Sequence, residues 1–159
     1  MGMDVIAKAA VSESAESFRN NVWWWRPLAQ YITECAPDRI VSKCTYWQSN
    51  DGDGLNAEDS RKLADFLEAE VANGNCAAWA AEREARLSNL PLLSCQWCGG
   101  TGTRRDAVGV QAGMDKKNWC NGCDGTGTKP HSDTDYRFSV ENVSEFVAFL
   151  RDCGGFEIW

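Results

Sequence analysis

The chain has 159 residues, which suits one domain or one domain with a small insert. Hydrophobic residues make up 43%, enough for a core, and the lack of any apolar run of about 18 residues excludes a transmembrane helix. The formal net charge of −7 disfavours binding to a nucleic-acid backbone by bulk charge and favours a protein partner with a basic surface. The first residues lack the basic start and apolar stretch of a secretory signal, so we expect a cytoplasmic protein with no membrane partner.

The first part of the chain is predicted to be helical. Residues 12–22 have a mixed pattern that favours a helix. Another helix is expected to place Pro27 in its first turn, where proline is tolerated, and to carry apolar residues at helical spacing after it. Pro37 should end that helix, because proline disfavours a helical residue before it.

Capping signals predict further helices along the chain. Asn56 is expected to cap one helix, with Asp59 three residues later as in a capping box. Residues 76–90 read as the next helix, and Ser139 is expected to cap the last one. The closing letters FEIW are expected to form a short strand or a docking tail. The apolar stripe of the last helix is predicted to be Val140, Val143, Phe146, Val147 and Leu150.

One nine-residue pattern occurs twice, as CQWCGGTGT at 95–103 and CNGCDGTGT at 120–128. Two residues between cysteines let one tight turn present both sulfurs to a single ion, and the glycines let the backbone bend around it. Each copy supplies half of a tetrahedron, so the pattern predicts one structural Zn²⁺. The predicted ligands are Cys95, Cys98, Cys120 and Cys123.

Other uses of these cysteines are less favoured. Four thiolates leave no open position for catalysis by the metal, and no βαβ pattern surrounds either pair, which disfavours a thioredoxin-like site. The ligand type alone leaves an iron–sulfur cluster open. The remaining four cysteines are scattered singly and are expected to be buried as small hydrophobic residues.

The motif Cys-x-x-Cys-x-Gly-x-Gly resembles the cysteine-rich domain of DnaJ-type co-chaperones, over about residues 94–129. That family uses four motifs and two zinc ions, whereas this chain has two motifs and no His-Pro-Asp triplet. The resemblance implies a structural zinc hairpin pair; it does not imply co-chaperone activity. With helices on both sides, we predict an α+β, mostly α fold. It would consist of an α-rich domain at 1–93 plus 130–159, with a Cys₄ zinc-hairpin module inserted at 94–129.

Three consecutive tryptophans at 23–25 cannot all face one way on a regular element. We therefore expect core packing plus one ring at the rim. The alternative is a binding hot spot, because tryptophan and arginine are enriched at such anchors. That hot spot would comprise Trp23, Trp24, Trp25 and Arg26.

Two charged segments are candidates for contacts with a partner. The loop SNDGDGLNAED at 49–59 fails the register of a calcium loop and indicates a solvated acidic loop or an acidic interaction surface. Its candidate binding residues are Asp51, Asp53, Glu58 and Asp59. The segment between the cysteine motifs is locally basic and indicates a solvated face or, in an alternative interpretation, a zinc ribbon that contacts nucleic acid. Those residues are Arg104, Arg105, Lys116 and Lys117.

No nucleophile motif, phosphate loop or dinucleotide fingerprint occurs, and the single histidine, His131, lies in a polar linker. We therefore predict a non-enzymatic protein; an enzyme with an unrecognised site is the remaining alternative. The runs WWWRPL, SNDGDGLNAEDS and SVENVSEFVAFLRDCGGFEIW, with the cysteine motifs, resemble a family of uncharacterised bacterial and phage-borne proteins. That resemblance implies a mobile-element protein in a bacterial host cell. The resulting hypothesis is a protein-binding module that inhibits a host defence nucleoprotein, as anti-CRISPR proteins do.

Overall fold

The computed structural model describes residues 2–159, which form two compact units. One unit contains the chain up to Glu84 together with Tyr136–Trp159, and the other contains Ala85–Asp135. Helix accounts for 46% and strand for 15%, which confirms the predicted α+β, mostly α class.

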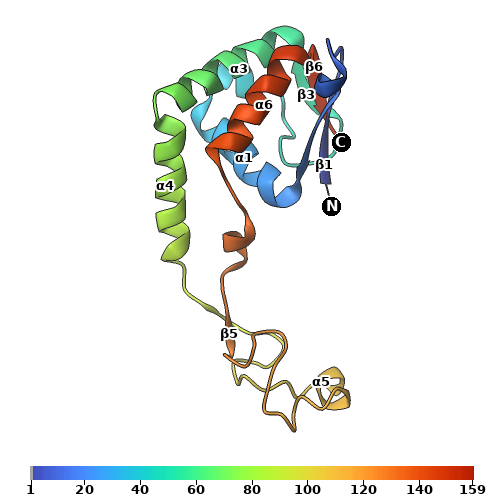
Figure 1. Ribbon diagram of the computed structural model, residues 1–159, viewed down its shortest axis with the longest axis vertical. Helices are drawn as coiled ribbons and strands as arrows, with labels where there is room; N and C mark the ends of the chain where they lie inside the picture. Colours follow the sequence, from blue (N-terminus) through green and yellow to red (C-terminus); the bar gives the residue numbers. More distant parts are fainter. Residues whose placement is uncertain (1) are drawn as a thin grey trace. The chain divides into compact units, whose positions relative to one another are not determined.

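The first unit is built on a four-stranded antiparallel sheet with the order β2-β1-β6-β3. The strands are β1 (Gly2–Ala7), β2 (Ser17–Asn21), β3 (Asp53–Asn56) and β6 (Gly155–Ile158). The first and last elements of the chain therefore lie side by side, with Val5 opposite Ile158 (Figure 1). The strand expected in the C-terminal FEIW run is confirmed.

The helix expected over 12–22 is wrong. A single 3₁₀ turn, Glu13–Ala15, is followed by strand β2, whose Phe18 and Asn20 turn toward the interior while Ser17, Arg19 and Asn21 do not. Exposed side chains alternate with buried or partly buried ones along these five residues, as in a strand. Pairing with β1 satisfies the backbone hydrogen-bonding groups of the segment, and this outweighs its weak helical preference.

Helix α1 (Val22–Cys35) begins five residues before Pro27, so Pro27 lies beyond the first turn, where it was expected. Asn21 caps it by accepting from the backbone N–H groups of Trp23 and Trp24. Pro27 thus lies inside the helix, where it has no N–H for the carbonyl of Trp23. The backbone N–H of Arg137 donates to that carbonyl instead, at 2.8 Å. The carbonyl of Trp23 therefore has a hydrogen-bond donor despite the proline.

The remaining helices of this unit are α2 (Asp38–Val41), α3 (Ala57–Ala72), α6 (Val140–Asp152) and most of α4 (Asn75–Ser88). The predicted caps are confirmed, since Asn56 accepts from Asp59 N at 2.8 Å and Ser139 from Asn142 N at 3.2 Å. Helices α3 and α6 pack against each other beside the sheet (Figure 1).

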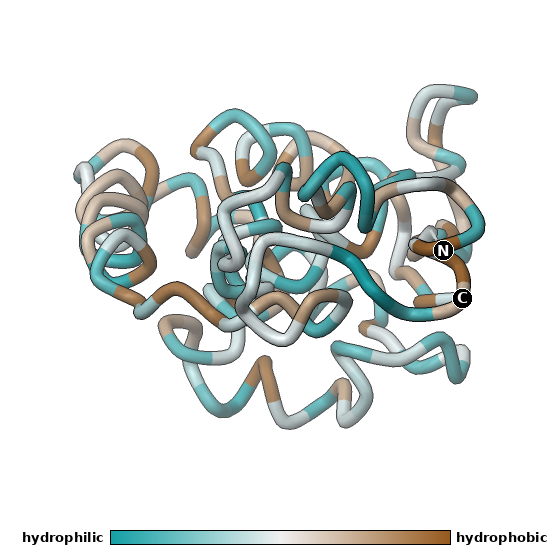
Figure 2. The backbone as a smooth tube through the Cα atoms, turned by 90° about the horizontal axis from the view of Figure 1, so that it is seen from below, coloured by the Kyte–Doolittle hydropathy of each residue, from teal (hydrophilic) through white to brown (hydrophobic). Residues whose placement is uncertain are grey.

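The core of this unit lies between α1, α3, α6 and the sheet, and Trp25 and Phe146 are fully buried in it. Their rings meet edge to face at 5.7 Å. The predicted stripe of α6 is confirmed at Val143, Phe146, Val147 and Leu150, while Val140 is partly buried. Brown and teal segments alternate along the helical turns, as amphipathic helices require (Figure 2).

The second unit has little regular structure. A two-stranded ribbon pairs β4 (Leu93–Ser94) with β5 (Thr128–Lys129), and one short helix, α5 (Ala107–Gln111), lies between the two cysteine motifs. The last turn, Ser132–Asp135, is a 3₁₀ helix. A segment with so few buried hydrophobic side chains needs another source of stability, and the cysteine cluster is the candidate.

Candidate metal centre

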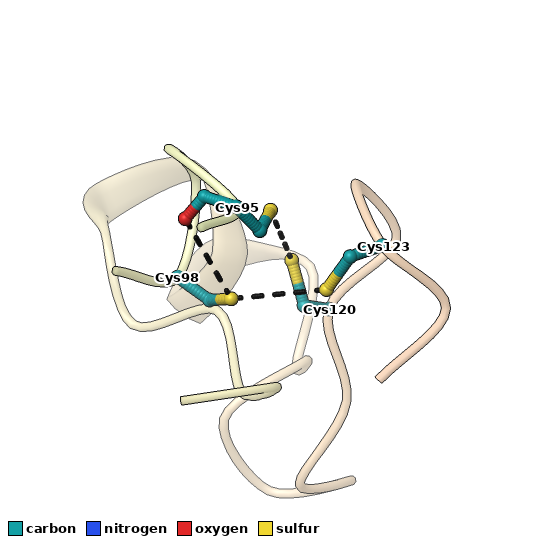
Figure 3. Close-up of side chains that lie close together, drawn as sticks. All are labelled: Cys95, Cys98, Cys120 and Cys123. Atoms are coloured by element: carbon teal, nitrogen blue, oxygen red, sulfur yellow. Dashed lines mark hydrogen bonds between the residues drawn. The ribbon is translucent and has the colours of Figure 1, made fainter. Parts of the chain in front are cut away.

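The four predicted cysteines converge on one point within the second unit. Their Sγ atoms all lie within 4.8 Å of one another, with Cys95 and Cys120 at 3.9 Å and Cys98 and Cys123 at 3.7 Å (Figure 3). A tetrahedral ion with metal–sulfur bonds of about 2.3 Å holds its sulfurs about 3.8 Å apart. The cluster therefore has the size of a site for a single metal ion. Cys95 and Cys120 are fully buried, and Cys123 nearly so.

The two motifs adopt matching turns around this point. The N–H of Gly102 donates to the Sγ of Cys98 at 3.3 Å, and the N–H of Gly127 donates to the Sγ of Cys123 at 3.2 Å. Each donor lies four residues after its cysteine, so the same bond is made twice. N–H groups directed at sulfur stabilise a thiolate, which is the form that binds metal.

Threonines at equivalent positions hold the two turns in shape. The hydroxyl of Thr101 donates toward the carbonyl of Cys98 at 2.7 Å, and that of Thr126 toward the carbonyl of Cys123 at 2.6 Å. The repeated Gly-Thr-Gly-Thr sequence is thus explained by local hydrogen bonding, which fixes the loop after each pair of ligands.

Glycines are required where the two turns approach each other. Gly102 and Gly127 have φ of 75° and 81°, and a Cβ on either would collide with a backbone carbonyl of the other motif, that of Gly125 or Gly100. A side chain at either position would push the two turns apart. The separation of the two halves of the cluster therefore depends on these glycines.

The electrostatic surroundings differ between the cysteines. Burial by itself would raise the pKa of the Cys98 thiol, but the N–H groups of Gly102 and Gly100 outweigh that effect and lower its pKa to about 7. Burial raises the pKa of the Cys120 thiol to about 11, although the N–H of Gly122 opposes it. A metal ion would supply the positive charge that ionises the second thiol, since a coordinating thiol is deprotonated outright.

Arg104, a candidate nucleic-acid contact in the alternative interpretation, is held by other side chains of this unit. Its guanidinium forms two bonds to Asp106, at 2.7 and 2.9 Å, and one to Asn121 at 3.1 Å, and it lies over the ring of Trp97 at 4.8 Å. Trp97 in turn covers Gly122, where a Cβ would meet the indole. Only 8% of Arg104 is exposed, so the side chain supports the cysteine turns and is not available to a phosphate.

Sequence reasoning missed this supporting group. The signals were an aromatic residue inside the first Cys-x-x-Cys, an acid two residues after Arg104, and a glycine at the equivalent position in the second motif. The other basic candidates, Arg105, Lys116 and Lys117, are exposed.

The three consecutive tryptophans differ in burial, because successive residues of a helix face different directions. Trp25 is fully buried and its Nε1 donates to the carbonyl of Trp47 at 2.7 Å, while Trp23 is 44% exposed and packs on Tyr136 at 4.9 Å. Trp24 is half-buried. The expectation of core packing plus one rim ring is confirmed. Arg26 is engaged with Tyr136, since its guanidinium donates to the phenol oxygen at 2.8 Å.

Two of the four acidic candidates form hydrogen bonds or ion pairs within the first unit. Asp59 is 6% exposed and interacts with Asn56 and Lys43, and Asp53 accepts from the backbone N–H groups of Thr45, Tyr46 and Gly54. The pattern of acids in the loop does not distinguish a carboxylate that binds backbone from one that faces solvent. Asp51 and Glu58 are exposed, with Ser49 and Lys62 as their respective neighbours.

The four remaining cysteines lie apart from the cluster. Cys44, Cys76 and Cys153 are buried and Cys35 is half-buried, which confirms the expectation for three of them. Burial raises the pKa of the Cys44 thiol to about 12, because desolvation and the nearby Asp53 both disfavour its thiolate. Within residues 2–159, the Cys₄ cluster is the one group of ligating side chains close enough to hold a metal ion.

The described helices contain none with the length and apolar character needed to span a membrane. Comparisons of the chain with protein-family models, with curated proteins and with solved structures found no match. The function has to be argued from the site itself.

Proposed function

We propose that the protein is a non-enzymatic binding module whose second unit is folded around one structural Zn²⁺. The observation that carries the proposal is the convergence of four sulfurs within 4.8 Å on two matching turns. Cys95, Cys98, Cys120 and Cys123 would hold the ion. Its chemistry is to neutralise four thiolates and to cross-link two turns that share little hydrophobic contact.

Zinc is favoured over the alternatives by the spacing of the sulfurs. The iron–sulfur clusters bound by four cysteines contain two or four iron ions bridged by inorganic sulfide, so some of their cysteine sulfurs lie farther apart than sulfurs around one ion. Four protein ligands also leave no position for water, which supports a structural role for the ion.

Metal analysis of protein purified without added metal tests this assignment. We expect one zinc per chain and no visible absorption, because Zn²⁺ has a filled d shell. Visible charge-transfer bands, together with iron and acid-labile sulfide, would replace zinc by an iron–sulfur cluster. Cys44→Ser is a matched control, since Cys44 lies outside the cluster and should leave the zinc content unchanged.

The binding role is supported by the distribution of charge. The first unit has 18 acidic and 10 basic side chains, a formal charge of −8, whereas the second unit has 5 acidic and 6 basic ones. An acidic surface of this kind favours a partner with a basic surface and disfavours nucleic acid. The partner that we propose is a defence nucleoprotein of a bacterial host, with the protein acting as an inhibitor in the manner of anti-CRISPR proteins.

Capture from a bacterial lysate with the tagged protein, with and without nuclease, tests the binding role. A stoichiometric protein that persists after nuclease treatment and is lost in high salt is expected. If purified defence nucleoproteins bind their nucleic-acid targets equally well with and without the protein, the inhibitor role is rejected while the binding role stands.

A second function is favoured by one observation, the exposure of two indoles in the second unit. Trp97 is 44% and Trp119 39% exposed, and Arg105, Lys116 and Lys117 are exposed in the same unit. Aromatic rings beside cations are the features that bind single-stranded nucleic acid. Binding of a labelled oligonucleotide that weakens steeply with added salt would support this function, and no binding at low salt would eliminate it.

A further inference from the structure

The first unit has a groove at the free edge of its sheet. It is lined by residues 18–20 of β2, by Trp24 of α1, and by Ser139 with the first turns of α6, and its volume is about 270 Å³. In the sheet order β2-β1-β6-β3, β2 is terminal, so no described strand pairs with its outer edge. The groove therefore lies beside backbone that an extended chain could pair with.

The charged side chains of the groove favour a cation. Glu141 and Glu145 lie one turn apart on α6, both are exposed, and neither forms an ion pair with any of residues 2–159. The groove also contains Arg19, but that guanidinium is directed to Asp4, at 3.5 Å on the neighbouring strand. Two carboxylates thus remain for a positive group that enters the groove.

An aromatic wall and a polar floor complete the groove. Trp24 is the half-buried ring of the tryptophan run, and a cation over an indole is attracted to its face. Asn20 and Asn142 also line the groove, and the amide of Asn20, which is 7% exposed, donates to Asn142 Oδ1 at 2.9 Å. The Nδ2 of Asn142 is buried and has no hydrogen-bond partner among the described residues.

We propose that this groove binds an arginine or lysine side chain presented by an extended segment of a partner protein. The segment would lie along β2, and its cation would sit between the ring of Trp24 and the carboxylates of Glu141 and Glu145. The proposal rests on the proposed function in that it supplies the chemistry by which a basic partner is recognised. It assigns Trp24 to binding, whereas Trp23 and Trp25 stabilise the fold.

Titration with blocked pentapeptides that differ only at the centre, Val-Thr-X-Thr-Val with X as Arg, Lys, Gln or Glu, tests the proposal. The readout is the amide and indole signals of the ¹⁵N-labelled full chain. The Arg and Lys peptides are expected to shift the Trp24 indole and the Asn20 and Asn142 side-chain amides. Glu145→Gln should weaken this binding about threefold or more, as loss of an exposed charge contact does. Glu13→Gln is the matched control, because Glu13 is exposed on the 3₁₀ turn and does not line the groove.

Equal binding of the Gln peptide, stronger binding of the Glu peptide, shifts confined to other residues, or no shifts at millimolar peptide would each overturn the proposal. Glu145→Gln changes one exposed side chain, so its folding is not in question. If Glu145→Gln binds the captured partner with the same Kd as the unchanged protein, the groove is rejected while the binding function stands. If the unchanged protein captures no partner, the binding function fails, and the peptides still report whether the groove takes a cation.

Discussion

Glycine and aspartate occupy equivalent positions in the two cysteine motifs, and the difference is informative. Gly99 has a φ of 60° and open space around it, and its counterpart Asp124 adopts a φ of 51° with a side chain present. Gly102 and Gly127 have no such freedom, because the opposite motif blocks the Cβ position. Gly102 and Gly127, the last glycine of each motif, therefore determine how closely the two halves of the metal site approach each other.

Gly102→Ala should therefore weaken metal binding, while Gly99→Asp should not. The alanine adds a left-handed backbone penalty of about 1 kcal/mol and a collision with the carbonyl of Gly125, so we expect zinc affinity to fall about tenfold or more. Gly99→Asp copies the residue found at Asp124. Competition with a zinc chelator measures both variants, and equal affinities would show that the approach of the two turns is not limiting.

Arg104 and Arg105 are adjacent in the sequence, but Arg104 is buried and Arg105 is exposed. Arg104→Ala removes the partner of Asp106, Asn121 and the Trp97 ring, so the second unit should melt at a lower temperature and release its metal faster. Arg105→Ala is the matched control, since its side chain is exposed. The Trp97 indole signal of the ¹⁵N-labelled chain, followed against temperature and chelator concentration, measures both variants, and indistinguishable curves would refute the supporting role of Arg104.

At the scale of elements, local signals located the long helices but, within the four-stranded sheet, only strand β6. The caps at Asn56 and Ser139 and the stripe of α6 depend on residues three or four apart, so they are visible in the sequence. Strands β1 and β6 pair residues from opposite ends of the chain, and β3 has only four residues, two of them polar or charged. The start of α1 was missed because Pro27 was placed in a first turn, and only the tertiary contact from Arg137 makes its interior position acceptable.

The hydrogen bonds between Asp53 of β3 and the backbone of the preceding loop should weaken at acidic pH. Partial burial by itself would raise the pKa of Asp53, but the N–H groups of Tyr46, Gly54 and Thr45 outweigh it and hold that pKa below its usual range. The native pKa is thus lower than the unfolded value of about 3.9, so the stabilisation is present above that pH and is lost as the pH falls through the native pKa.

Asp53→Asn tests this directly. The free energy of unfolding of the unchanged protein should exceed that of Asp53→Asn at pH 6, and the difference should shrink as the pH falls below about 4. Denaturant unfolding of both proteins at several pH values measures the difference, in which the contributions of all other groups cancel. A difference that stays constant with pH would refute the role of the ionised carboxylate.

At the scale of the whole molecule, the two units differ in the residues that form their buried clusters. The first unit has a continuous core around Trp25 and Phe146, whereas the second has a cluster made of its own cysteines. The cysteine site was predictable in full, because spacing in a repeated motif determines it. Its supporting shell and the groove beside β2 were not, since both combine side chains from segments that only the fold brings together.

The decisive measurement is removal of metal from the ¹⁵N-labelled full chain, followed residue by residue. With a strong chelator and a reductant, amide signals of residues 85–135 should collapse toward unfolded positions, and those of residues 2–84 and 136–159 should stay dispersed. Readdition of one equivalent of Zn²⁺ should restore the spectrum. An unchanged spectrum after complete loss of metal would contradict the account, because the second unit would then fold without the ion that the four cysteines are proposed to hold.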